Sequence, residues 1–276
     1  MIRKKVEGNM SKKKKTAVLI EVFLFSVAVV WVIPVISTMQ VSLKNGGFQN
    51  YKDVFSTRIN DVLILPKMIL NSFIITGGTI MIVMISASLA AYAFSKLKFK
   101  GRKFFFVLLL SCYAIPILST LIPNTLLIRD LGLRGSYISM IVLLATANIP
   151  LAILIFKGNF DGVSSTYLEA AAIDGCTDFQ VFLRILLPMS KSAIVNVLVV
   201  LFIQVWNDFQ IPLVFSTDPE KYTLTLAPTF FGLTQNRLDL PHLFASIVII
   251  AIPVIVFYMF MQDKIVEGMS MGGLKE

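Results

Sequence analysis

The chain has 276 residues, of which 56% are apolar and only 15% are charged, and its mean hydropathy is +0.80. A water-soluble core of this size cannot bury so much apolar surface, so the composition excludes an ordinary soluble protein and predicts that a bilayer is the solvent. The formal net charge is +9, but the positions of the basic residues indicate membrane topology and not nucleic-acid binding.

Six apolar runs are long enough to cross about 30 Å of hydrocarbon, which takes roughly 20 helical residues. We therefore predict an all-α integral membrane protein whose residues 16–263 form one transmembrane domain. The first run is too long and too rich in Val, Ile and Phe for a signal peptide and lacks a small-residue cleavage site, so it is expected to stay as a helix. In chain order the runs cover residues 16–38, 69–95, 104–124, 136–157, 190–215 and 242–263.

Lysines and arginines set the expected orientation. They crowd the N-terminal segment 1–15 and the connector 96–103, and they recur around the insert 158–189 and in the tail 264–276. The positive-inside rule makes these segments cytoplasmic, so both termini are expected inside the bacterial cytoplasmic (inner) membrane. The segment 216–241 is then extracytoplasmic. Residues before Met10 carry no structural signal, so Met10 is an alternative start.

Prolines fall inside five of the six runs. Each one removes a backbone donor, and the freed carbonyl must be satisfied by protein or water. Kinked helices around a wet path are typical of transporters, although membrane helices also tolerate single prolines. The residues are Pro34, Pro116, Pro123, Pro150, Pro212 and Pro253.

The insert 158–189 between the fourth and fifth runs has the pattern of two short helices. Thr166 and Glu169 have the spacing of a capping box, and Thr177 begins a second one. Between the two, Gly175 is suited to the left-handed residue that ends a helix. The first helix is too short to be stable alone in water, so it either docks on another protein or braces the bundle. An apolar stripe follows and ends at a proline; its residues are Phe179, Phe182, Leu183, Leu186 and Pro188.

Polar residues in the fourth and fifth runs are candidates for a solute path. Asp208 lies 17 residues after Lys191, about 25 Å along a helix at roughly 1.5 Å per residue, which places it near the outer boundary. Intramembrane acids usually face a cavity, and neighbouring side chains could bond to and stack on a solute. A solvated Asp beside an interfacial Trp is the alternative. The candidates are Asn148, Gln204, Trp206, Asn207 and Asp208.

No metal site or disulfide framework is expected. Cys112 lies in an apolar run and Cys176 in the polar insert, so the two are expected at different depths. His242 has no ligand-like spacing and is expected to be an interfacial residue at a helix start.

The insert also resembles a known motif. Glu169-Ala170-Ala171, then Gly175 after three residues, then Ile185-x-Leu187-Pro188 after nine more, look like the EAA loop of ABC importer permeases. The resemblance implies the type I ABC importer permease fold, with six transmembrane helices and a cytoplasmic two-helix coupling loop at 158–189. It implies that the loop docks in a cleft of an ATP-hydrolysing subunit and transmits its closure. The implied coupling residues are Glu169, Ala170, Ala171, Asp174, Gly175, Ile185, Leu187 and Pro188.

Further stretches are similar to the permeases of sugar importers, from about residue 16 to the end. The nearest likeness is to the G-type, maltodextrin-permease-like subunit, although Gly273 and Leu274 replace the usual Ala and Val. The likeness implies three kinds of partner: an F-type permease that forms a heterodimer with this chain, two ATPase subunits, and an extracytoplasmic sugar-binding protein reached by residues 216–241. The stretches are Asn71-Ser72, Ala90 to Ser95, residues 96–103, Trp206 to Phe209 with Pro212-Leu213, Tyr222 to Leu226, and residues 266–275.

The resulting hypothesis is a permease that translocates an oligosaccharide by alternating access and is not itself an enzyme. No G-x-x-x-x-G-K-[ST] phosphate loop occurs in the sequence, so ATP and Mg²⁺ are expected on the partner ATPase subunits and no cofactor on this chain. Membrane lipid is the other expected contact, and nucleic acid is not. An importer of a polyamine, an amino acid or phosphate would show the same loop, so these solutes stay open. An ion-coupled transporter would favour ionisable residues deep within the spans, and a membrane enzyme would need a catalytic constellation; both are disfavoured.

Overall fold

The computed structural model describes the backbone of residues 2–234 and 237–273, and most of it is helical. Four helices in this part of the chain are long and apolar enough to cross a membrane, and the number rises to six if each of two bent helix pairs forms one span. The tail residues Leu274 and Lys275 lie outside the described residues. The four long helices are α1 (Ile2–Ser42), α3 (Ile64–Lys96), α6 (Tyr137–Asp161) and α13 (Leu240–Gly273).

The run 104–124, which contains two of the prolines expected to kink the spans, is divided between two helices. Helix α4 (Arg102–Tyr113) and helix α5 (Ile117–Asp130) meet at a bend of 95°. Pro116 is the N-cap of α5, and a proline disfavours helical geometry at the residue before it. The break therefore lies where the proline sits.

The run 190–215 is also divided. Helix α10 (Lys191–Trp206) ends at Asn207, and the short helix α11 (Gln210–Phe215) follows. Pro212 explains the break, because it has no N–H to offer the carbonyl of Asp208 and its ring would clash with that carbonyl in a continuous helix. At its other end, α10 meets residues 178–189 at a bend of 79°.

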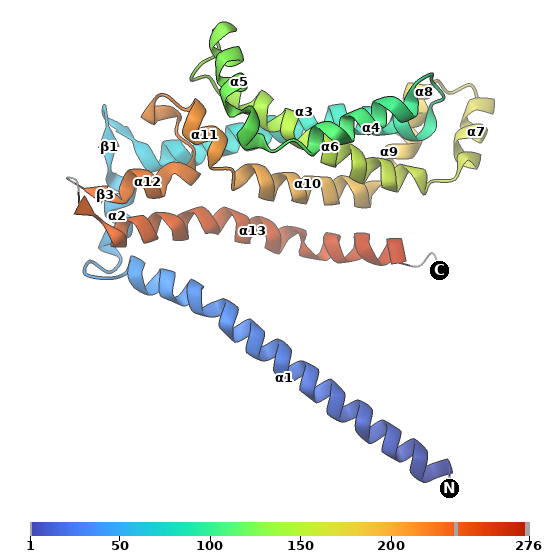
Figure 1. The fold of residues 1–276 in the computed structure, drawn as a ribbon, viewed down its shortest axis with the longest axis horizontal. Helices are drawn as coiled ribbons and strands as arrows, with labels where there is room; N and C mark the ends of the chain where they lie inside the picture. The colour runs from blue at the N-terminus through green and yellow to red at the C-terminus, as the bar shows by residue number, and fades with distance from the viewer. Residues whose placement is uncertain (1, 235–236, 274–276) are drawn as a thin grey trace.

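The helices α3, α6, α10 and α13 run along the long axis of the molecule, whereas α1 diverges from them towards its N-terminus (Figure 1). Small side chains such as Ala87, Ala91 and Ala152 lie in the core where α3, α6 and α10 pack, so the backbones can approach closely. None of the most apolar window of α1 is buried within this chain. Its apolar surface therefore needs cover from lipid or from another protein.

Small elements close the two ends of the bundle (Figure 1). One end, called here the hairpin end, carries two antiparallel hairpins and several short helices that pack onto α3 and α13. The opposite end carries the insert. The elements of the hairpin end are α2 (Gln49–Ser56), β1 (Arg58–Ile59), β2 (Val62–Leu63), the 3₁₀ turns η2 (Pro219–Lys221) and η3 (Leu224–Leu226), α12 (Ala227–Phe231), β3 (Leu233–Thr234) and β4 (Arg237–Leu238). Those of the insert are α7 (Ser165–Ile173), α8 (Asp178–Val181), the π-helix η1 (Phe182–Leu186) and α9 (Leu187–Met189).

Candidate functional site

The first helix of the insert, α7, begins two residues earlier than expected. Its N-cap is Ser164, whose hydroxyl accepts a hydrogen bond from the amide of Thr166, so the capping box expected at Thr166 and Glu169 is wrong. The carbonyl of Val163 next to the cap accepts a bond of 2.7 Å from the Lys96 ammonium. This bond ties the start of α7 to the end of α3.

The end of α7 is a left-handed glycine turn, as expected. Gly175 has φ +80°, and its amide bonds to the carbonyl of Ala172 while the amide of Cys176 bonds to that of Ala171. These two bonds form a Schellman motif, which satisfies carbonyls that a helix end leaves free. The turn sends the chain from α7 into α8.

One face of α7 is apolar and exposed. Tyr167, Ala170 and Ile173 follow one another at intervals of three residues, and Ile173 is 87% exposed. The opposite side buries Ala171 against the protein. Glu169 and Asp174 are exposed and lie on the same short helix and its cap. A stripe of this kind costs free energy in water, so it indicates a docking surface. The sequence reasoning missed Tyr167 and Ile173, although their spacing was visible.

The second part of the insert is anchored to the bundle. Thr177 and Gln180 form the expected capping box. Phe182 and Leu186 are buried, and the ring of Phe182 packs 5.3 Å from that of Tyr92 on α3. Phe179 and Leu183, expected to join this buried stripe, are exposed instead.

A π-helix follows α8 directly in the chain. The amide of Leu187 bonds to the carbonyl of Phe182, five residues back. Pro188 comes next and cannot bond to the carbonyl of Arg184, and the wider turn gives its ring space. The helix continues to Met189, one residue past the expected end. Of the predicted stripe, Phe182 and Leu186 are buried in the core.

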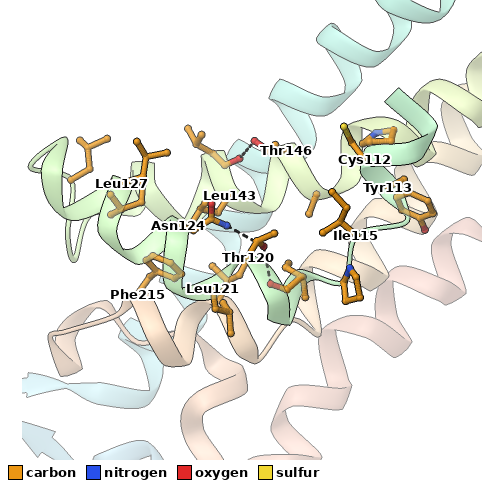
Figure 2. Close-up of a pocket in the computed structure, with 18 of the residues that line it drawn as sticks. Cys112, Tyr113, Ile115, Thr120, Leu121, Asn124, Leu127, Leu143, Thr146 and Phe215 are labelled. Carbon is orange, nitrogen blue, oxygen red and sulfur yellow. Dashed lines mark hydrogen bonds between the residues drawn. The ribbon is translucent and has the colours of Figure 1, made fainter. Parts of the chain in front are cut away.

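A cavity lies elsewhere, beside the bend between α4 and α5. Its volume is about 640 Å³, within the range of roughly 300–1,000 Å³ typical of small-molecule sites. Thr120 and Asn124 of α5 face it together with Thr146 of α6 and Tyr113 of α4 (Figure 2). Most of the remaining lining is apolar. The hydroxyl of Thr120 donates to the carbonyl of Ile117 and accepts from the amide of Asn124 at 3.3 Å.

The predicted path residues of α10 do not line this cavity. Trp206 is 2% exposed, donates from Nε1 to the carbonyl of Ile250, and lies 4.9 Å edge-on from Phe73. Its ring is therefore part of the core. Asn207 is exposed and bonds back to the carbonyl of Ile203, and Gln204 is exposed. Contact of these side chains with a solute stays a prediction.

Asp208 and Asn148 have structural partners. Asp208 is half-buried, and its carboxylate accepts from the amide of Ile211 at 2.9 Å, so it caps α11. Asn148 is buried in α6 and donates to the carbonyl of Leu144.

His242 lies in the first turn of α13 at the hairpin end. Its Nδ1 is 2.7 Å from the carboxylate of Asp239, and its Nε2 is 3.6 Å from that of Asp53 on α2. The residue thus connects α2 to the start of α13.

Residues 83–271 match the model of the family described as "Binding-protein-dependent transport system inner membrane component". The chain is 34% identical over 215 residues to a probable ABC transporter permease, YurM, of Bacillus subtilis, an alignment that spans 76% of this chain and 70% of YurM. It is 31% identical over 234 residues to the galactooligosaccharides transport system permease GanQ of the same organism, which covers 84% of this chain and 81% of GanQ.

The fold has a solved counterpart. A chain of a bacterial ABC transporter involved in the import of the acidic polysaccharide alginate superposes with a TM-score of 0.76 at 21% identity, over 91% of this chain and 96% of that one. At this identity the likeness concerns the fold alone. It confirms the predicted all-α type I importer permease fold.

Proposed function

We infer that this chain, which belongs to the family of binding-protein-dependent transport system inner membrane components, translocates an oligosaccharide as one of two permeases in an ABC importer. Members of the family are the membrane subunits of such transporters, so ATP hydrolysis belongs to partner subunits. The sugar class is supported by the similarity to GanQ, whose name states galactooligosaccharides. The G-type assignment rests on the sequence resemblance described above.

The exposed face of α7 carries the proposal for coupling. A short helix with an uncovered apolar stripe, fixed at both ends by Ser164 and Gly175, suits insertion into a cleft of an ATPase subunit. Closure of two ATP-loaded subunits would move α7. The ring of Phe182 on η1 packs against that of Tyr92 on α3, so the motion would reach the bundle there. ATP and Mg²⁺ would stay on those partners throughout. We place Glu169, Ala170, Asp174 and Gly175 at this contact, with Ala171, Ile185, Leu187 and Pro188 behind it.

Affinity purification of the tagged chain from its own membranes tests the assembly. An ATPase subunit and a second permease should be recovered in stable proportion, and a binding protein should associate at the opposite face. Recovery of the chain alone would contradict the proposal.

The cavity beside α5 is the proposed wall of the solute path in this chain. Its threonine and asparagine side chains offer hydrogen bonds to sugar hydroxyls, and Tyr113 offers an aromatic face. Thr120 and Thr125 form a matched pair, because both lie on α5 and both hydroxyls bond back to a helix carbonyl, but only Thr120 lines the cavity.

Replacing Thr120 by Val should raise the KM of oligosaccharide uptake by about two- to ten-fold, the effect of one hydrogen bond. Thr125→Val should leave the KM unchanged. Uptake of labelled galacto- and arabino-oligosaccharides, with an amino acid, a polyamine and phosphate as comparison solutes, gives the measurement. Equal KM values for the two variants would show that the cavity does not line the solute path. Uptake of a comparison solute alone would contradict the assignment of the solute as a sugar.

The orientation follows from the basic residues. We propose that α7 and both termini face the cytoplasm, because lysines and arginines gather at that end, and that the hairpin end faces the binding protein. Cys176 in the insert reports on this directly. A membrane-impermeant maleimide should label it in inside-out vesicles and not in right-side-out vesicles, and the reverse pattern would invert the proposed topology.

A further inference from the structure

Three stretches that are far apart in the sequence meet at the hairpin end. Asn71-Ser72 lies about two turns into α3, residues 222–226 belong to the segment after α11, and Trp206 to Phe209 span the break that follows α10. Hydrogen bonds between them form one buried network.

Asn71 is the centre of this network. Its side chain is completely buried, and its amide donates to the carbonyls of Glu220 at 2.8 Å and Tyr222 at 2.9 Å. Its carbonyl oxygen accepts from the hydroxyl of Tyr137 on α6 at 2.8 Å. All of these polar groups are therefore satisfied, and they hold residues 220–222 against two long helices.

Ser72 and Lys221 extend the same attachment. The hydroxyl of Ser72 accepts from the amide of Leu224 at 2.8 Å, and the Lys221 ammonium donates to the carbonyl of Gly135 at 2.8 Å. Leu224 and Leu226 are buried in the core beneath. Residues 219–226 are thus a plug built into the bundle and not a free loop.

The plug also bonds to the break after α10. The hydroxyl of Thr225 donates to the carbonyl of Asp208 at 2.8 Å and accepts from Thr223. Asp208 is four residues before Pro212, so in a helix its carbonyl would have no backbone donor. Thr225 supplies the donor that the proline removes. The carbonyl left free at the break in the helix is therefore hydrogen-bonded by the plug.

Helix α10 joins this point to the insert. It runs from Lys191, next to α9, to Trp206, next to the Asp208 carbonyl. We propose that Asn71 and Thr225 form a latch that couples residues 219–226 to α10, so that a binding protein docking at the hairpin end and an ATPase acting at α7 act on the same helix. The role of the latch in import rests on the proposed function. Its mechanical part, the attachment of residues 219–226 to the end of α10, involves this chain alone. Asn71 and Thr225 are positioning residues in it.

Thr225→Val removes the donor with little change of shape, and Thr225→Ser keeps it. Thr229→Val is the matched control, because the Thr229 hydroxyl donates to the carbonyl of Leu226, three residues earlier in the chain. The complex is purified in lipid nanodiscs, and amide hydrogen exchange is followed by mass spectrometry. Thr225→Val should speed exchange about five-fold, as expected for one lost hydrogen bond, both in residues 219–226 and in residues 203–211. Thr225→Ser and Thr229→Val should exchange like the parent.

In the same complexes, Thr225→Val should change the rate of ATP hydrolysis at unchanged assembly and unchanged melting temperature. A rise in exchange confined to residues 219–226, or a lower melting temperature with unaltered ATP hydrolysis, would overturn the latch. Exchange is measured on this chain, so it decides the mechanical part even if no ATPase subunit is recovered. Failure of the proposed function and failure of the latch are therefore distinguishable.

Discussion

Replacing Gly175 by Ala should weaken coupling while the protein remains in the membrane. Gly175 has φ +80°, where a side chain with a Cβ costs roughly 1–2 kcal/mol. No atom lies within 4 Å of the position that the Cβ would take, so the backbone strain is the whole cost. Helix α7 has nine residues and cannot hold its geometry alone. A free-energy cost of about 1–2 kcal/mol lowers the population of the intact turn by about 5–30-fold.

The matched control is Gly158→Ala. Gly158 lies in the last turns of α6, also has no atom within 4 Å of an added Cβ, and does not have a positive φ. An alanine there favours the helix. The assay compares membrane abundance by immunoblot, initial uptake rate, and ATP hydrolysis by the purified complex.

Gly175→Ala should match the parent in abundance and lose at least about five-fold in uptake, in line with the strain. Gly175→Asp should lose more, because it adds a charge at the docking turn. Gly158→Ala should behave like the parent. Equal uptake by Gly175→Ala and Gly158→Ala at equal abundance would refute the argument that the left-handed turn positions α7.

Two further substitutions separate docking from packing. Ile173→Asp changes a side chain that is 87% exposed, so the melting temperature of the isolated chain should stay the same. The ATPase subunit should be lost from the purified complex. Retention of the ATPase subunit would exclude this face as the contact. Phe182→Ala leaves a cavity at a buried site against Tyr92, so it should lower the free energy of unfolding by about 3–5 kcal/mol. The measurement is the melting temperature in detergent, which should fall. An unchanged melting temperature would mean that η1 is not anchored there.

The long helices could be predicted because lipid leaves few alternatives. An apolar run of about 20 residues must satisfy its backbone internally, and a helix does so. The runs at 69–95 and 242–263 accordingly lie within α3 and α13, and the run at 136–157 begins at the N-cap of α6 and otherwise lies within it. The breaks at Pro116 and Pro212 were visible as prolines, but the sequence could not tell a kink from a full break, since membrane helices accommodate both.

The insert shows a different limit. Thr166 and Ser164 are both good N-caps, and two residues of sequence cannot rank them. Lys96 binds the carbonyl of Val163 from the end of α3, beside the cap that forms. A hydrogen bond between residues so far apart in the chain cannot be predicted from the local sequence pattern. The same holds for residues 219–226, which the charge pattern places in the outer segment 216–241 but whose bonds to Asn71 and Ser72 of α3 no local pattern predicts.

The two ends of α10 respond differently to a neighbouring proline, and this bears on where motion can enter. At the hairpin end the carbonyl freed by Pro212 has a donor from another segment, Thr225. At the insert end the space for Pro188 comes from a local π-turn, and the buried hydroxyl of Ser190, at the bend, has no hydrogen-bond partner among the described residues. A hinge with fewer bonds to other segments opens at lower cost. Movement of α7 should therefore bend the chain at Ser190 before it disturbs Asp208, and α10 would carry the displacement as a rigid unit towards the plug.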